Sequence, residues 1–412
     1  MQSGTCDTII PVRTMIIGDP SVLLPLETPG FIFVMEMKIN AKAEDGELPQ
    51  IIRTLVTSAI AYRLSPFHPL ASFPGQTIAR VSRIWSSVIS RRGYQHIYYH
   101  ELLLKYGPVI RIGPNHIITT EASAIPVVLG AGPFRKSDRY VTFVTPKEPG
   151  SLLAVVDPHE HAERRRLWEK GMNFKALQSY KEIIHSRLQQ LVSLLSQQQQ
   201  EVDINLSTFD IMGDLAFSGQ FDALQGGSTE LLDHLQGIRT ALGIQDYLML
   251  LTWLRYYIPF VPKRLMTEVS WFRQFSTNAM LRRMENGPKT QDFFYHLLNE
   301  EHDEGSVLPL RTLFREASLI IPAGYDTTAN AGCHAFFYLL TNPIYLKRLQ
   351  NEVDQHFSNV DEVYSKDDLQ NLPYLNAVIN ETLRLAPGLA SGSQRYLPKG
   401  NGTNGGIMLG NT

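Results

Sequence analysis

An acid and two alcohols stand together in AGYDTT, residues 323–328, within a long apolar stretch of the sequence. Pro322, directly before them, lacks an N–H, so the carbonyl four residues back loses its helical donor. Gly324 has no side chain and lets another group approach the backbone. A weakened helical turn beside Asp326 and Thr327 suits a proton relay. The alternative is a kinked core helix in which a threonine bonds its own backbone.

Glu381 and Arg384 lie three positions apart in ETLRLAP, which places both on one face of a helix. An exposed pair of this kind stabilises a helix by only about 0.2–0.5 kcal/mol. The neighbouring residues Ala377 and Leu383 are apolar, so a partly buried pair would need further hydrogen-bond partners to offset its desolvation. The motif alone leaves both readings open, a surface pair and a structural ion pair.

His161 and Arg165 lie four positions apart in HAERRRLW and share a helix face. Together with Arg164 and Arg166 they form a basic helix that suits carboxylate or phosphate groups. The alternative is a solvated basic face. His159 and His161 diverge on a helix, so this pair does not indicate a metal site.

The elements that must position these residues are mostly helices, and the fold class expected is mainly α with small β-sheets. Residues 1–50 have no clear period and are expected to be irregular. Alternation over residues 108–120 predicts two short strands joined at Gly113-Pro114, and the chain beyond Pro387 is Gly-rich and strand-like. Helical spacing of apolar residues predicts helices over 78–105, 161–177, 179–200, 206–219, 229–241, 245–256, 262–285, 290–300, 310–340, 343–357 and 373–386.

The composition excludes several classes of protein. The 412 residues allow several domains or one large one. With 38 Lys and Arg against 40 Asp and Glu, the net charge of −2 does not favour nucleic acid as a partner. Only two cysteines, Cys6 and Cys333, occur, which excludes a disulfide framework or a cysteine-rich metal cluster. The sequence has no window of the roughly 20 apolar residues that a membrane span needs. Residues 51–64 form either an ordinary helix or an interfacial anchor remnant.

The motifs, taken in order, resemble those of the cytochrome P450 family, and in particular its fungal microsomal members. AGYDTT is similar to the oxygen-activation motif, ETLRLAP to the E-x-x-R helix, and FDIMGDLAF to a core helix of the fungal group. PFHPLASFPG resembles the Pro-rich hinge, YGPVIRIGPNHI the first sheet, HAERRRLWEKGMNFKAL the helix at a haem propionate, and SGSQRYLPKG the strands after the E-x-x-R helix. The resemblance divides the chain into an irregular leader with an anchor remnant, 1–60, and a partial cytochrome P450 domain, 61–412.

The resemblance implies a haem-thiolate monooxygenase that oxidises a small apolar molecule, of the kind met in secondary metabolism. Its cofactor would be haem b and its electron donor NADPH-cytochrome reductase, at the surface of the endoplasmic reticulum membrane; otherwise the protein would be cytoplasmic. Asp326 and Thr327 would supply protons to the oxygen chemistry, and Glu381 and Arg384 would be structural. The residues that would contact the haem are His161, Arg165 and Arg395 at the propionates, and Ala323 and Gly324 beside the oxygen pocket.

One part of the family pattern is not found in this sequence. After Arg384 there is no F-x-x-G-x-R-x-C-x-G loop, which in the family carries the cysteine below the iron. Neither Cys6 in the leader nor Cys333 on the central helix has the position of that ligand, so no metal-ligating residue is predicted. We therefore expect the chain to be truncated before the loop and inactive as it stands. The alternative function is that of a non-catalytic helical binding or scaffold remnant.

Overall fold

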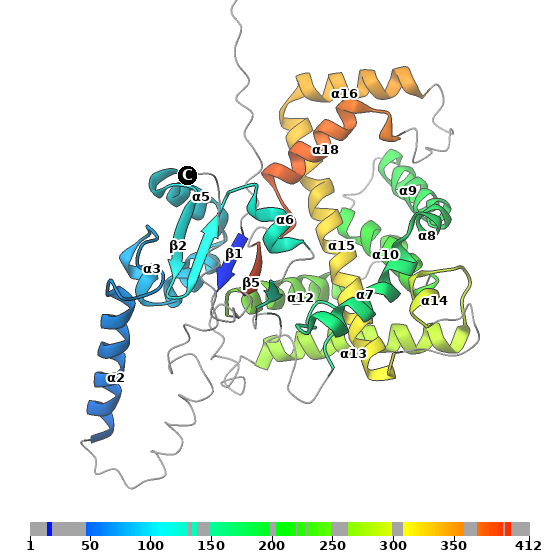
Figure 1. Ribbon diagram of the computed structural model, residues 1–412. Coiled ribbons are helices and arrows are strands. Elements are labelled where there is room, and N and C mark those ends of the chain that lie inside the picture. Colours follow the sequence, from blue (N-terminus) through cyan, green and yellow to red (C-terminus); the bar gives the residue numbers. More distant parts are fainter. Residues whose placement is uncertain are drawn as a thin grey trace, which may run out of the picture. The chain divides into compact units, whose positions relative to one another are not determined.

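The structure is a computed structural model that describes residues 15–18, 47–130, 134–137, 140, 149–197, 203–219, 221–226, 229–248, 263–298, 308–357, 369–389 and 392–396. Helices predominate among these residues, and the strands are short (Figure 1). The predicted fold class, mainly α with a small β component, is confirmed. The chain divides into two compact units: unit 1 is Met1–Phe143, Leu242–Val261 and Ala390–Thr412, and unit 2 is Val144–Ala241 and Pro262–Leu389.

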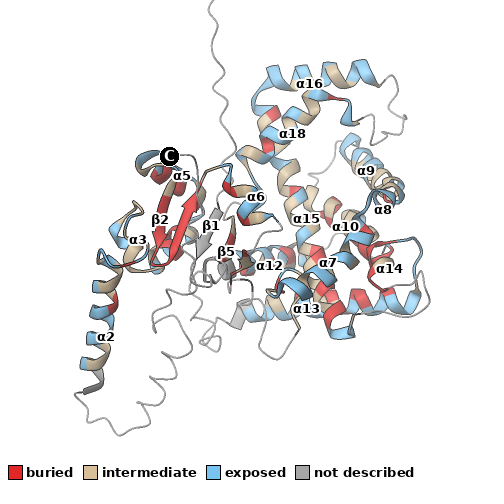
Figure 2. Ribbon diagram, in the orientation of Figure 1, coloured by how far each residue is buried: buried red, intermediate tan, exposed pale blue. Residues whose placement is uncertain are grey.

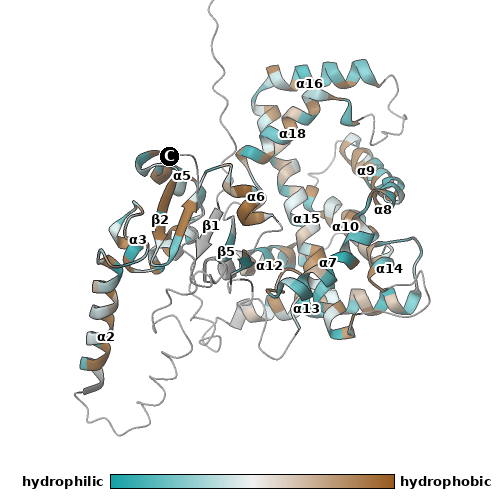
Figure 3. Cartoon of the chain, in the orientation of Figure 1, coloured by the Kyte–Doolittle hydropathy of each residue, from teal (hydrophilic) through white to brown (hydrophobic). Residues whose placement is uncertain are grey.

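Unit 1 holds a five-stranded sheet with the strand order β2-β3-β1-β5-β4. The strands are β1 (Met15–Gly18), β2 (Val109–Gly113), β3 (His116–Thr119), β4 (Arg135–Lys136) and β5 (Ser393–Tyr396). β1 runs parallel to β5, and the other neighbours are antiparallel. The hairpin of β2 and β3 is the one predicted from alternation. It is almost wholly buried (Figure 2), and β2 is strongly hydrophobic (Figure 3).

β1 lies in the leader, for which the sequence predicts no regular structure. Its residue Ile16 pairs with Ile118 of β3 on one side and with Gln394 of β5 on the other. Ile favours strands because its branched side chain packs well on a pleated surface. A run of four residues is too short to show alternation, so its partner strands are needed to recognise it.

The described residues of unit 1 also form the helices α2 (Glu47–Leu64), α3 (Thr77–Val81), α4 (Ile84–Arg91), α5 (Gln95–Tyr106) and α6 (Ala124–Leu129). The periodic stretch 78–105 is therefore three helices and not one. α3 ends at Ser82, which has an extended backbone. After α4, Gly93 has a φ of 79°, a conformation that glycine adopts without strain. Among the helices that the structure describes, none has the length and apolar character to span a membrane.

A buried arginine fastens the Pro-rich segment to the sheet of unit 1. Arg111 of β2 is 1% exposed. Its guanidinium donates to the carbonyls of Gly113 and Pro114 at 3.2 and 2.7 Å. Its Nη2 lies 3.3 Å from Nε2 of His68 in the Pro-rich segment. Burial lowers the pKa of Arg111 to about 10.

We expect the protein to lose stability on acidification because unit 1 buries two histidines in their neutral form. Burial lowers the pKa of His68 and lowers that of His116 well below the ordinary value of 6.5, and nearby arginine charges add to both effects. Below that pH the unfolded chain binds these protons and the folded chain does not. The stabilisation is therefore complete above pH 6.5 and declines below it, by at most about 1.4 kcal/mol per pH unit for each histidine.

Urea unfolding at several pH values between about 5 and 8 measures this dependence. The free energy of unfolding should fall more steeply with acidification in the native protein than in the His116→Gln variant. His159→Gln is the matched control, because the His159 side chain is 86% exposed. Equal slopes in the native protein and the His116→Gln variant would contradict the prediction.

The described residues of unit 2 form helices joined by turns and irregular segments, without a strand. Its elements are α7 (Pro158–Met172), α8 (Phe174–Ser179), α9 (Lys181–Ser196), α10 (Ile204–Phe217), α11 (Ala223–Gly226), most of α12 (Thr229–Leu248), α13 (Lys263–Asn286), α14 (Phe293–Leu297), α15 (Leu310–Thr341), α16 (Pro343–His356) and α18 (Pro373–Leu385). An Asp or Asn side chain accepts a first-turn N–H at the start of α7, α8, α10 and α14. α15 continues through Pro322 as one helix, as the sequence predicts. The predicted helix 245–256 supplies the end of α12; its residues beyond 248 lie outside the described part.

Aromatic side chains join α10 to α15 in the core of unit 2. Phe209 of α10 stacks on Phe221 with ring centroids 4.7 Å apart, and meets Tyr325 of α15 edge-on at 5.5 Å. All three are buried. Such contacts add about 0.5–1.5 kcal/mol per pair beyond the area that they bury. They fix the rotation of α15 about its axis, and hence the direction in which its polar residues point.

The E-x-x-R helix α18 lies beside α16, next to the end of α15 (Figure 1). Glu352 of α16 accepts hydrogen bonds from the backbone N–H groups of Tyr374 and Leu375, at 2.9 and 2.8 Å. These donors belong to the first turn of α18 and have no partner within the helix itself. The carboxylate of one helix therefore caps the next and positions Glu381 and Arg384.

Candidate active site on the long helix α15

The acid–alcohol motif lies in the middle of α15, and its side chains point in different directions around the helix. Tyr325 is buried, Thr327 is half-buried and Ala323 is exposed. The Thr327 hydroxyl donates to the Ala323 carbonyl at 2.8 Å. This contact is the backbone bond that the sequence offers as the alternative to a relay. It also keeps the hydroxyl on the same face as Ala323.

Gly324 allows α10 and α15 to approach each other closely. A side-chain Cβ at this position would lie 2.1 Å from the sulfur of Met212 in α10. The residue therefore faces α10, whereas its neighbour Ala323 is exposed. Of the two residues expected beside an oxygen pocket, Ala323 alone lies on an open face in the described part of unit 2.

Asp326 forms an ion pair that the sequence does not reveal. Its Oδ1 lies 2.7 Å from Nε of Arg239 in α12. Nη2 of Arg239 donates to Oδ1 of Asn205, at the start of α10, also at 2.7 Å. Burial raises the pKa of the neighbouring Tyr325 to about 12, and the charge of Asp326 contributes to that rise. The arginine and the acid are far apart in sequence, so local spacing gives no signal for this pair.

The basic helix α7 divides its arginines between two roles. Arg165 is exposed and donates to Glu169 at 2.8 Å, an i,i+4 pair on the helix surface. Arg164 is turned inward and donates to the carbonyl of Gly150 and to Glu160, both at 2.6 Å. The predicted shared face of His161 and Arg165 follows from the helix that is observed. The sequence predicts that Arg164 belongs to the same basic surface as Arg165. In the structure Arg164 is turned inward instead.

Glu381 and Arg384 do pair. Arg384 donates from Nε and Nη2 to both carboxylate oxygens of Glu381, at 2.7 and 2.6 Å. These hydrogen bonds lower the pKa of Glu381. The Glu381 side chain is 56% exposed and that of Arg384 is 21% exposed. Among the described residues, Glu381 and Arg384 therefore form a surface ion pair.

Arg395 lies on β5 and so belongs to unit 1. Its Nη1 donates to the hydroxyl of Tyr140 at 3.5 Å and to the carbonyl of Gln394 at 3.1 Å. The other predicted site residues belong to unit 2. The aromatic residues considered for a substrate pocket, Phe143, Trp253, Tyr256 and Tyr257, lie outside the described residues.

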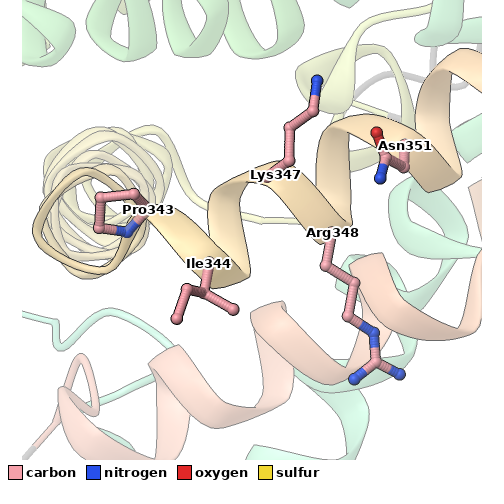
Figure 4. A pocket seen from close by; sticks show the side chains of 5 residues that line it. All are labelled: Pro343, Ile344, Lys347, Arg348 and Asn351. Atoms are coloured by element: carbon pink, nitrogen blue, oxygen red, sulfur yellow. The ribbon is translucent and has the colours of Figure 1, made fainter.

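Two open surface hollows among the described residues of unit 2 lie apart from the acid–alcohol motif. One, of about 470 Å³, runs along α16 and is lined by Pro343, Ile344, Lys347, Arg348 and Asn351. In Figure 4, Lys347 and Arg348 point to opposite sides of α16, and Arg348 reaches toward α18, where it lies over the Tyr374 ring at 4.3 Å. The other, of about 270 Å³, is lined by Lys170, Asn173, Lys175, Ala176, Gln291, Tyr295 and His296. Asp326 and Thr327 line neither hollow.

Comparison with known proteins settles the family. A family model described as Cytochrome P450 matches residues 79–407. Cytochrome P450 67 of Uromyces fabae is 30% identical over 82% of this chain and 64% of its own length. Cytochrome P450 monooxygenase aba2 of Botryotinia fuckeliana (strain B05.10) is 31% identical over 81% of this chain and 67% of its own length. Tryprostatin B 6-hydroxylase of Neosartorya fischeri is 32% identical over 80% of this chain and 61% of its own length.

The mainly helical fold, with an acid–alcohol pair on its long helix, agrees with this family match. The chain is a member of the cytochrome P450 family. It spans about two thirds of the length of these relatives, 64% for the Uromyces fabae protein. The family resemblance predicted from the sequence is confirmed.

The residues of this chain fit one side of a haem site. His161, Arg165 and Trp168 recur at i, i+4 and i+7, so they share a face of α7. The Trp168 indole N–H is buried without a hydrogen-bond partner among the described residues. A buried donor of this kind is costly unless an acceptor such as a carboxylate meets it. Together these three side chains suit an anionic propionate.

Cys333, the cysteine among the described residues, does not fit the role of the thiolate ligand in a haem-thiolate site. Cys333 is exposed and lies on α15 itself, the helix that carries Asp326. Burial and the charge of Asp203 raise the pKa of its thiol, which disfavours the thiolate form. Cys6 lies outside the described residues. The described residues also contain no group of three His, Cys, Asp or Glu side chains that could hold a metal ion.

Proposed function

We propose that this chain derives from, or forms part of, an enzyme that oxidises a small apolar secondary metabolite, with haem b as cofactor. NADPH-cytochrome reductase would supply the electrons. The names of two relatives support this proposal: one is a monooxygenase, and the other is a hydroxylase named for tryprostatin B. The endoplasmic reticulum membrane surface is the proposed location. Exposed Leu55, Val56 and Leu64 on α2 are consistent with such a surface.

The observation that carries the proposal is the family match over residues 79–407 together with the place of Asp326 and Thr327 within it. We assign the proton-bearing roles to these two residues. The proposed propionate contacts are His161, Arg165 and Arg395. Ala323, exposed beside Thr327, would border the oxygen pocket. Gly324 would contribute by letting α10 approach, and Glu381 and Arg384 would be structural.

We further propose that the 412-residue polypeptide alone is inactive, because its two cysteines do not supply the iron ligand. The test is to express this polypeptide, supply haem, reduce it and record the carbon monoxide spectrum. We expect no thiolate-type band and no product. A thiolate-type band that disappears in a Cys333→Ser variant would overturn this part of the proposal and identify the ligand.

A fusion tests the enzymatic part separately. A segment that carries the family's F-x-x-G-x-R-x-C-x-G loop is joined to the end of this chain. The fused protein should bind haem with a thiolate-type band and consume NADPH when reductase is added. A folded fusion that binds no haem would count against the monooxygenase proposal.

The second candidate function is that of a helical binding or scaffold protein. The observation that favours it is a run of exposed apolar side chains from the end of α15 into α16: Phe336 at 57%, Phe337 at 60%, Leu340 at 66% and Ile344 at 82% exposed. Large exposed apolar patches mark interaction sites in folded proteins. A scaffold must fold alone or with a partner, so a thermal melt without a cooperative transition under both conditions would exclude this function.

A further inference from the structure

Glu316 is a buried acid in the first half of α15 that the candidate site does not use. Its side chain is 0% exposed, and its neighbours along α15, Leu313, Ala317 and Ile320, are buried apolar residues. Replacing a buried ion pair by apolar side chains of similar volume is often neutral or stabilising. Stability alone therefore does not explain an acid at this position, and its partners indicate what it does.

The acid meets the segment 149–157, which leads into α7 and contains neither helix nor strand. Both carboxylate oxygens of Glu316 accept the backbone N–H of Leu152, at 2.9 and 3.0 Å. Leu152 lies in a turn, in which the N–H of Ala154 donates to the Ser151 carbonyl at 2.8 Å. The acid of α15 therefore fastens an irregular segment through its backbone.

Arg164 of α7 joins the same contact. Its Nη1 donates to the Gly150 carbonyl at 2.6 Å and lies 3.7 Å from Oε1 of Glu316. The Arg164 side chain is 13% exposed, so salt screens this ion pair less than it screens a surface pair. Further along α7, Trp168 packs on Phe293 of α14 with ring centroids 4.8 Å apart. One guanidinium thus connects α7 to the segment before it and to α15.

Glu316 lies on the face of α15 that carries the candidate site. It precedes Ala323 by seven positions and Thr327 by eleven, which correspond to about two and about three helical turns. The three residues therefore share one face, with Glu316 about 10 Å from Ala323 along the axis. This face is covered at Glu316 and exposed at Ala323. The segment 149–157 thus reaches α15 two turns before the open part of the face.

We propose that Glu316 is a positioning residue, which fastens the segment 149–157 to α15 and, through Arg164, sets the position of α7 relative to α15. The inference rests on the proposed function, which gives α7 the propionate contacts and α15 the acid and the alcohol. A hydrogen bond to a carboxylate is about twice as strong as one between neutral groups. It is also directional, whereas an apolar contact lets a backbone slide. An acid therefore fixes the spacing of the two helices where an apolar residue would not.

Hydrogen exchange of the whole 412-residue chain, measured by mass spectrometry without haem, tests the hold on the segment. Glu316→Leu removes the acceptor, so exchange in peptides covering 151–157 should become about tenfold faster or more, as expected for a lost hydrogen bond to a charged group. Glu316→Gln keeps one oxygen that can accept the Leu152 N–H, so its effect should be smaller. Arg164→Met should also have a smaller effect, because it leaves the acceptor in place.

A distance measurement tests the position of α7. One spin label is attached to Cys333, which is exposed on α15, and the other to a Glu163→Cys substitution on α7, in a chain that also carries Cys6→Ser. The Glu163 side chain is 61% exposed, so the label should not disturb the packing of α7. Pulsed electron paramagnetic resonance then gives the distribution of distances, which should broaden or shift in Glu316→Leu and in Arg164→Met. An unchanged distribution in both variants would overturn the inference.

Arg283→Met separates this local contact from a general loss of stability, because it breaks another buried ion pair of unit 2, that with Asp292. It should not accelerate exchange over 151–157. An equal acceleration in Arg283→Met and Glu316→Leu would overturn the inference, as would unchanged exchange in Glu316→Leu. Should Glu316→Leu not fold, the milder Glu316→Gln and Arg164→Met decide between the same outcomes. None of these measurements needs haem, so a failure of the proposed monooxygenase function would be seen separately, in the fused protein.

Discussion

Replacing Arg283 with methionine should lower the free energy of unfolding by about 3–5 kcal/mol, the usual effect of breaking a buried ion pair. Arg283 of α13 and Asp292 before α14 are both 0% exposed. Arg283 donates from Nε and Nη2 to the two carboxylate oxygens of Asp292, at 2.5 and 3.0 Å. Ser218 and the backbone N–H of Tyr295 also donate to this carboxylate. Without the arginine, a buried negative charge keeps only neutral donors.

Arg165→Met is the matched control, because it removes a pair with side chains 63% and 59% exposed. It should change the free energy of unfolding by about 1 kcal/mol or less. Urea unfolding at neutral pH, followed by circular dichroism, measures both variants against the native protein. Comparable losses in the two variants would show that burial of the Arg283 pair does not carry the stability assigned to it.

Most helices of unit 2 could be predicted from the sequence, whereas the contacts between them could not. The predicted helix 161–177 is two helices, α7 and α8, and the one predicted to end at 241 continues to Leu248. Periodicity and the dipeptide Asn342-Pro343 give α15 and α16 within a residue or two. β1 could not be predicted, because a run of four residues is too short to show the alternation of a strand. The Arg283–Asp292 pair joins residues only nine positions apart. It depends on the path of the chain between α13 and α14, which local spacing does not describe.

The candidate site shows the same division. Local spacing places Asp326 beside Thr327, His161 with Arg165, and Glu381 with Arg384, because each pair lies within one helix. It does not find Arg239 or Asn205, since these reach Asp326 across helices. Local spacing also assigns Arg164 to the exposed basic face, whereas its hydrogen bond to the Gly150 carbonyl of the preceding segment turns it inward. A site that is assembled from several helices needs their packing before it can be recognised.

Replacing Arg187 with methionine should cost about 2 kcal/mol, between the values for exposed and for buried ion pairs, because three carboxylates lose their shared cation. Arg187 of α9 donates to both oxygens of Asp214 at 2.6 and 2.9 Å, and to Asp222 at 3.2 Å. Asp210, which is 0% exposed, lies 3.9 Å away. Asp210 and Asp214 come from FDIMGDLAF, the segment that resembles the fungal core helix. Asp214 holds α9 against α10, whereas Asp210 chiefly accepts the backbone N–H groups of Ala223 and Leu224, at 2.7 and 2.8 Å.

The loss in Arg187→Met should become smaller as the pH falls. Burial raises the pKa of Asp210, and the charge of Arg187 opposes that rise. Removing the arginine lets the folded variant bind protons that its unfolded chain does not bind, so acidification stabilises the variant relative to the native protein. Urea unfolding at about pH 7 and pH 5 measures the difference.

Asp222→Asn is the control, because its side chain is 62% exposed. The free energy of unfolding lost in this variant should stay below about 1 kcal/mol at both pH values. A deficit in Arg187→Met that is the same at both pH values would indicate lost packing of the arginine stem, with no contribution from the carboxylate cluster.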